Sequence, residues 1–197
     1  MESSSTTDII RFLQTEQISL FSLADFGRMF KIDNRQTLYK KLQRLEKKKI
    51  VQRLVKGKYS FLLSSVSDFT IANYLYRPSY VSLETALSFY GIITGFPYQI
   101  TSITIQKAKS FNIDTKEFRF SQISPNLFWG WEKKEDFLIA EPEKALLDYI
   151  YFGLKGLRSV DWDELETTGI NKKILFLYAK RFNNQKILEV ATDNLKL

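Results

Sequence analysis

A change in the spacing of apolar residues at 47–49 constrains the first third of this chain more than any other feature. Before it, Leu38, Leu42 and Leu45 recur at intervals of four and three, which places them on one side of a helix. After it, two runs rich in β-branched and aromatic residues meet at Lys56-Gly57, a pattern typical of a hairpin. The sequence therefore predicts a helix over 35–48 that leads directly into two paired strands.

Two shorter helices are predicted before this one. Thr7 is a candidate N-cap for a helix from Asp8 to about Glu16, Ser22 for a second short helix, and Asn34 for the helix that begins at residue 35. Three helices followed by a basic hairpin is the arrangement of a winged helix-turn-helix domain. We expect such a domain over residues 1–63.

The surplus positive charge of the chain lies entirely in this part. Residues 1–65 hold thirteen Lys and Arg against six Asp and Glu, a net charge of +7, whereas residues 66–197 hold sixteen of each. A charge asymmetry of this kind bears on partners rather than on fold. Double-stranded DNA is the expected partner of the first part alone.

The candidate DNA-binding residues follow from this placement, because they occupy the faces of the third helix that its leucines leave outside and the region of the hairpin tip. They are Arg35, Gln36, Thr37, Tyr39, Lys40, Lys41 and Arg44 on the helix, and Arg53, Lys56 and Lys58 on the hairpin. Two other interpretations stay open. The lysines form an ordinary solvated face, or the domain docks onto a protein.

The composition excludes most catalytic machinery. The chain has no His and no Cys, so it lacks imidazole acid–base chemistry and thiolate metal ligands, and we expect no enzyme activity, no cofactor and no metal. Two acid-x-Lys triplets, Asp114-Thr115-Lys116 and Glu132-Lys133-Lys134, leave a metal-dependent nuclease as an alternative. No apolar run approaches the roughly 20 residues that span a bilayer, and no secretory signal is visible. We therefore expect a cytoplasmic protein without membrane contact.

Residues 67–197 are predicted to form a second, mixed α/β domain, so the fold class is α+β. Ser82 and Pro142 mark the starts of two helices, and β-rich runs between them predict a small, mostly antiparallel sheet. Helical segments over 161–167, 172–181 and 185–195 are expected to close the chain.

Two segments of this domain have residue patterns that the requirements of folding alone do not explain. The first, residues 80–91, reads Tyr-Val-Ser-Leu-Glu-Thr-Ala-Leu-Ser-Phe-Tyr-Gly, and the second, residues 139–148, reads Ile-Ala-Glu-Pro-Glu-Lys-Ala-Leu-Leu-Asp. Together with the preceding winged helix they resemble the AbiEi family, the antitoxin half of bacterial type IV abortive-infection toxin–antitoxin systems. The resemblance spans nearly the whole chain.

The resemblance implies a transcriptional autorepressor that binds inverted repeats in its own promoter through the N-terminal domain. It also implies that the second domain counteracts a nucleotidyltransferase toxin, without requiring a stable complex. The polar motif positions, to which the resemblance assigns no role, are Ser82, Glu84, Glu143, Lys144 and Asp148. A stand-alone winged-helix transcription factor with a ligand-sensing or dimerising second domain remains the main alternative.

Overall fold

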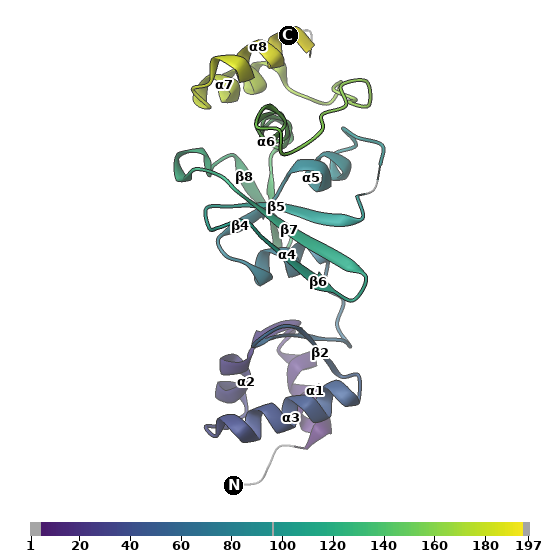
Figure 1. Ribbon diagram of the computed structural model, residues 1–197. Coiled ribbons are helices and arrows are strands. Elements are labelled where there is room, and N and C mark those ends of the chain that lie inside the picture. The colour runs from purple at the N-terminus through teal and green to yellow at the C-terminus, as the bar shows by residue number, and fades with distance from the viewer. Residues whose placement is uncertain (1–4, 96, 195–197) are drawn as a thin grey trace. The chain divides into compact units, whose positions relative to one another are not determined.

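The computed structural model describes residues 5–95 and 97–194. The chain divides into two compact units, Met1–Leu75 and Tyr76–Leu197. Both units combine helices with strands (Figure 1), which confirms the predicted α+β class.

The first unit contains a small antiparallel sheet and four helices. Its elements are α1 (Thr6–Thr15), β1 (Leu20–Ser22), α2 (Leu23–Met29), α3 (Arg35–Lys47), β2 (Val51–Val55), β3 (Lys58–Phe61) and α4 (Asp68–Leu75). The strands are ordered β1-β3-β2, with β3 antiparallel to both neighbours. The predicted hairpin is therefore present, and β1 extends it into a three-stranded sheet.

Side-chain caps fix where these helices begin. Ser5, not Thr7, caps α1: its Oγ accepts a hydrogen bond from the Asp8 amide at 3.2 Å, and Asp8 Oδ2 accepts one from the Ser5 amide at 2.9 Å. Ser22 and Asp25 form the same reciprocal pair at the start of α2. Asn34 caps α3 as predicted, since its Oδ1 accepts a bond from the Thr37 amide at 3.0 Å.

One apolar core holds α1, α2 and α3 against the sheet. Leu42 and Leu45 of α3 are buried, and they pack with Ile9 of α1, Phe26 of α2 and Phe61 of β3. The leucine stripe read from the sequence is thus the inner side of α3. Its opposite side is left facing outward.

The two units meet at a later residue than the joint predicted after residue 63. Lys58 of β3 explains the difference, because its Nζ donates to the backbone oxygens of Tyr74 and Leu75 at 2.6 and 2.9 Å. These bonds tie the end of α4 to the hairpin, and α4 therefore groups with the first unit.

The second unit is built on a six-stranded mixed sheet. Its elements are β4 (Ser79–Val81), α5 (Leu83–Phe89), β5 (Gln99–Thr104), β6 (Lys109–Ile113), β7 (Lys116–Gln122), a 3-10 turn η1 (Pro125–Leu127), β8 (Trp131–Lys134), β9 (Phe137–Ala140), α6 (Pro142–Leu154), α7 (Lys172–Arg181) and α8 (Gln185–Asn194). The strand order is β6-β7-β5-β4-β9-β8.

This sheet is larger and less antiparallel than the sequence predicted. Two of its pairings are parallel, β4 with β9 and β5 with β7. The parallel pairs join strands that are not consecutive in the chain, which local alternation cannot reveal. Helices α5 and α6 pack together against the sheet, and α7 and α8 pack on α6 (Figure 1).

The closing segments are partly as predicted. Helices α7 and α8 are present where segments 172–181 and 185–195 were predicted. Residue 195, the end of the last predicted segment, lies outside the described residues. The prediction of a helix over 161–167 is wrong. Asp161 Oδ1 instead accepts a bond from the Asp163 amide at 3.1 Å, and the Glu166 amide donates to the Ile92 oxygen at 2.8 Å, so this backbone is satisfied without a helix.

Candidate nucleic-acid interface

The outer side of α3 carries most of the predicted DNA-binding residues. Arg35, Gln36, Thr37, Lys40 and Arg44 are exposed, and Tyr39 and Lys41 are half-buried. Because a helix turns once every 3.6 residues, the set divides between two edges of this side.

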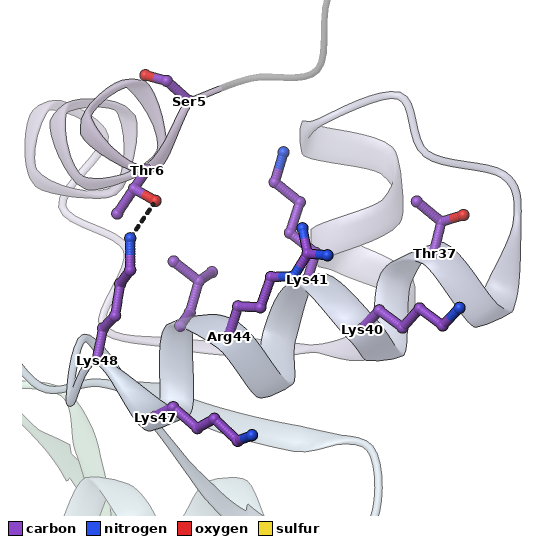
Figure 2. Close-up of a pocket in the computed structure, with 9 residues that line it drawn as sticks. Ser5, Thr6, Thr37, Lys40, Lys41, Arg44, Lys47 and Lys48 are labelled. Carbon is purple, nitrogen blue, oxygen red and sulfur yellow. Dashed lines mark hydrogen bonds between the residues drawn. The ribbon is translucent and has the colours of Figure 1, made fainter.

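One edge of α3 faces the beginning of α1. Thr37, Lys41, Arg44 and Lys48 follow one another at intervals of four, three and four along it. With Ser5 and Thr6 they border an open groove of about 570 Å³, shown in Figure 2. The complete set of residues along the groove is Ser5, Thr6, Thr37, Lys40, Lys41, Arg44, Leu45, Lys47 and Lys48.

Positive charge is crowded in this groove. Lys48 Nζ donates to the Thr6 hydroxyl at 3.3 Å across it, the bond drawn in Figure 2. Partial burial lowers the pKa of Lys41, and the charge of Arg44 lowers it further, while Asp8 acts in the opposite direction. Lys41 and Arg44 therefore repel each other, and a bound anion would relieve that repulsion.

The other edge of α3 lies toward the hairpin. The guanidinium of Arg35 stands 5.8 Å from the centre of the Tyr39 ring, within cation–π range. Burial raises the pKa of Tyr59 on β3, and smaller contributions come from Arg53, Glu46 and Tyr39. The Arg53 amide on β2 donates to Glu46 Oε1 of α3 at 3.3 Å, so α3 and the hairpin share this edge.

The hairpin presents two of its three predicted cations. Arg53 and Lys56 are exposed, and Gly57 completes the turn at φ +79°, a conformation that favours glycine. Lys58 is half-buried: besides its two bonds to the end of α4, its Nζ lies 4.9 Å from the Tyr74 ring centre. Lys58 therefore has a structural role in this unit, which its position in the sequence did not indicate.

In the second unit, three of the five polar motif residues belong to one buried network. Lys144 and Asp148 form an ion pair with neither side chain exposed. Asp148 Oδ2 also accepts bonds from the Tyr80 hydroxyl at 3.0 Å and the Ser82 hydroxyl at 2.9 Å, and Lys144 Nζ donates to the Tyr80 oxygen at 3.0 Å. Ser82 precedes α5 as predicted, but its hydroxyl serves Asp148 and does not cap the helix.

Burial dominates the electrostatics of this network. It raises the pKa of Asp148 and of Tyr80 and lowers that of Lys144, while the ion pair acts against the shifts of its two partners. Aromatic rings of Tyr80, Trp129 and Phe182 surround the ammonium with centres 5.0–5.5 Å away. The network joins β4, the start of α5, α6 and the segment after α7. Its geometry is that of a structural joint rather than an accessible site.

The two remaining motif residues also make internal contacts. Glu84 lies 2.8 Å from Arg158 in a largely buried ion pair. Glu143 Oε1 accepts a bond from the Asn171 amide at 2.8 Å, just before α7. Both contacts fix the C-terminal part of the unit to α5 and α6.

The acid-x-Lys triplets do not come together. Asp114 lies at the turn between β6 and β7, and Glu132 lies on β8, so the two are at opposite edges of the sheet. Across residues 5–95 and 97–194, no group of three or more Asp or Glu side chains is arranged to hold a metal ion. Within the described residues, neither triplet therefore belongs to a cluster of three carboxylates.

Sequence reasoning missed Lys47, Lys48 and Thr6 as partners of the predicted helix residues. The signal for Lys48 was present, since it continues the spacing of Thr37, Lys41 and Arg44. Thr6 left no signal, because only folding brings α1 beside α3.

Helices in the described part of the chain are too short or too polar to cross a bilayer. No model of a known protein family and no curated protein matches this sequence.

Proposed function

We propose that the first unit is a winged helix-turn-helix domain that binds double-stranded DNA. The observation that carries this proposal is the order of its elements, the three helices α1–α3 before the β2–β3 hairpin with strands ordered β1-β3-β2, combined with the exposed cations of α3. In this arrangement α3 enters the major groove and the hairpin lies along the adjacent backbone. Arg53 and Lys56 are suited to the backbone, and Arg35 and Gln36 to base edges.

A binding titration tests this function. The full chain is titrated with the DNA upstream of its own gene and with an unrelated duplex between about 50 mM and 200 mM salt. We expect tighter binding to the upstream DNA and a steep loss of affinity with salt for both. Salt-independent binding, or none, would contradict the proposal.

We further propose that the whole chain is an AbiEi-type autorepressor and antitoxin that acts in the cytoplasm and counteracts a nucleotidyltransferase toxin. The support is the residue pattern of the two segments in the second unit. The buried network joining Ser82, Lys144 and Asp148 gives a physical reason for three polar positions in that pattern.

The antitoxin function has its own test. We expect a nucleotidyltransferase gene in the same operon, and we expect co-expression of the full chain to restore growth of cells that produce this enzyme. The variant Arg35→Ala with Lys56→Ala should lose repression and still restore growth, because both substitutions lie in the first unit. Failure of the unaltered chain to restore growth would reject the antitoxin role.

A second candidate is a repressor whose second unit senses an anionic ligand. A cavity of about 580 Å³ favours it, since Lys109, Arg119 and Arg158 border it together with Ser121. Two of these cations already have partners, because Arg158 bonds Ser121 at 3.1 Å and Arg119 pairs with Glu117 at 3.3 Å. Release of DNA by a small anion, lost on Arg119→Ala, would favour this candidate.

A further inference from the structure

The groove between α1 and α3 is rich in positively charged side chains. Five of the nine residues along it are Lys40, Lys41, Arg44, Lys47 and Lys48, and within the described residues no carboxylate borders it. Asp8, whose charge acts on Lys41, also accepts bonds from the Ser5 amide and hydroxyl. The cap of α1 is thus satisfied internally, and an anion in the groove would be held by α3.

The dimensions of the groove fit a chain of phosphates better than a single one. Residues 44 to 48, at the end of α3, extend over roughly 6 Å at 1.5 Å per residue. A DNA strand advances about 3.4 Å along the duplex axis for each phosphate. Arg44, Lys47 and Lys48 can therefore meet about two successive phosphates, with the hydroxyls of Thr37 and Thr6 as additional donors.

We propose that one sugar–phosphate backbone of the bound duplex lies in the α1–α3 groove. Arg44 and Lys48 bind its phosphates there, and these contacts fix the angle at which α3 enters the major groove. This inference rests on the proposed DNA-binding function and assigns separate tasks to the two edges of α3. The α1-side edge holds phosphates, and the edge with Arg35 and Tyr39 reads sequence.

The test is a salt titration of the full chain with two unrelated duplexes of about 20 base pairs. The groove variant is Arg44→Gln with Lys48→Gln, which removes two charges and keeps good helix formers. The matched control is Lys107→Gln with Lys173→Gln, two exposed lysines of the second unit that change the net charge equally. A third variant, Arg44→Lys with Lys48→Arg, keeps the charge, and circular dichroism checks that each variant is folded.

We expect the groove variant to bind both duplexes several-fold more weakly. The slope of log affinity against log salt concentration should fall by about two, one for each phosphate that the variant no longer neutralises. The control and the charge-retaining variant should keep the slope of the unaltered protein.

Other outcomes separate the failure of this inference from that of the proposed function. The phosphate groove is overturned, and DNA binding is left intact, if the groove variant keeps the affinity and the salt slope of the unaltered protein. The same holds if its affinity falls for one duplex only. If the unaltered protein shows no salt-dependent binding, both the phosphate groove and the proposed DNA-binding function are overturned. Tighter binding to an RNA duplex of the same sequence overturns the assignment to DNA.

Discussion

Lys144 and Asp148 lie one turn apart on α6 and form an ion pair from which solvent is excluded. A buried ion pair contributes little net stability compared with apolar residues, but removing one partner leaves an uncompensated charge. Tyr80 and Ser82 add bonds that satisfy the carboxylate. The pair therefore fixes how α6 packs on the sheet.

Asp148→Ala should destabilise the second unit by about 3–5 kcal/mol, because it leaves the Lys144 ammonium buried without its counter-charge. Tryptophan fluorescence during urea unfolding measures this unit alone, since Trp129, Trp131 and Trp162 all belong to it. The double variant Lys144→Met with Asp148→Asn is the control. It should be more stable than Asp148→Ala, and a double variant of lower stability would show that the charge pair is not the cause.

Lys58→Met should destabilise the first unit by about 1–3 kcal/mol and leave DNA affinity and its salt dependence unchanged. The lysine donates to the carbonyls that end α4, and hydrogen bonds to charged groups are of this strength. Hydrogen exchange of the α4 amides measures the first effect, and a duplex titration measures the second.

Lys56→Met is the matched variant for this comparison, since it changes an exposed lysine of the same hairpin. It should lower the salt slope by about one without affecting α4. The interpretation fails if the two lysines behave alike in both measurements.

Prediction from sequence worked where the determinants are local. Helix α3, its Asn34 cap and its leucine stripe depend on neighbours within one or two turns, and all three are present. The three-residue strands β1 and β4 escaped prediction, because they exist through distant pairings such as Leu20 with Ser60 and Val81 with Ile139.

The roles of the candidate site residues were likewise predictable where they depend on local spacing and not where they depend on distant contacts. The exposed set on α3 followed from helical spacing, whereas the structural role of Lys58 depends on α4, which reaches it only in the folded unit. The spacing of Lys144 and Asp148, four residues apart, is that of two residues on one helix face. It could not indicate that the face is buried and that Tyr80 and Ser82 complete the network.

Arg35→Ala or Gln36→Ala should reduce discrimination between the upstream DNA and unrelated DNA by about 1–3 kcal/mol, with little change in the salt slope for unrelated DNA. These residues lie at the start of α3, the proposed recognition helix, and it is the start of such a helix that contacts base edges. Competition titrations with both duplexes measure the ratio. An equal loss of affinity for the two would assign these residues to the backbone instead.

The stability of the first unit should fall at acid pH through Asp25. Hydrogen bonds from the Ser22 side chain and backbone lower the pKa of this carboxyl below its usual 3.8, with partial burial acting against them. A lowered pKa in the folded state stabilises the fold above the unfolded value, and that contribution is lost as pH falls through the folded value. The loss should therefore lie below about pH 4.

Thermal unfolding followed by circular dichroism between about pH 6 and pH 2.5 measures this effect. Asp25→Asn should show a smaller acid-induced fall in the melting temperature than the unaltered chain. Asp33→Asn is the control, an exposed carboxylate before α3 in the same unit. The assignment to Asp25 would be rejected if both variants kept the full acid dependence.

Gly130 should tolerate alanine less well than Gly156, although both adopt nearly the same positive φ, +71° and +69°. A Cβ at Gly130 would stand 3.0–3.2 Å from three side-chain carbons of Lys144, whereas a Cβ at Gly156 would meet nothing within 4 Å. Gly156→Ala therefore carries only the backbone cost of about 1 kcal/mol. Gly130→Ala adds displacement of a lysine that Asp148 and three aromatic rings hold in place. Urea unfolding followed by tryptophan fluorescence should place Gly130→Ala below Gly156→Ala by about 1–3 kcal/mol, and equal losses would mean that Lys144 can move without cost.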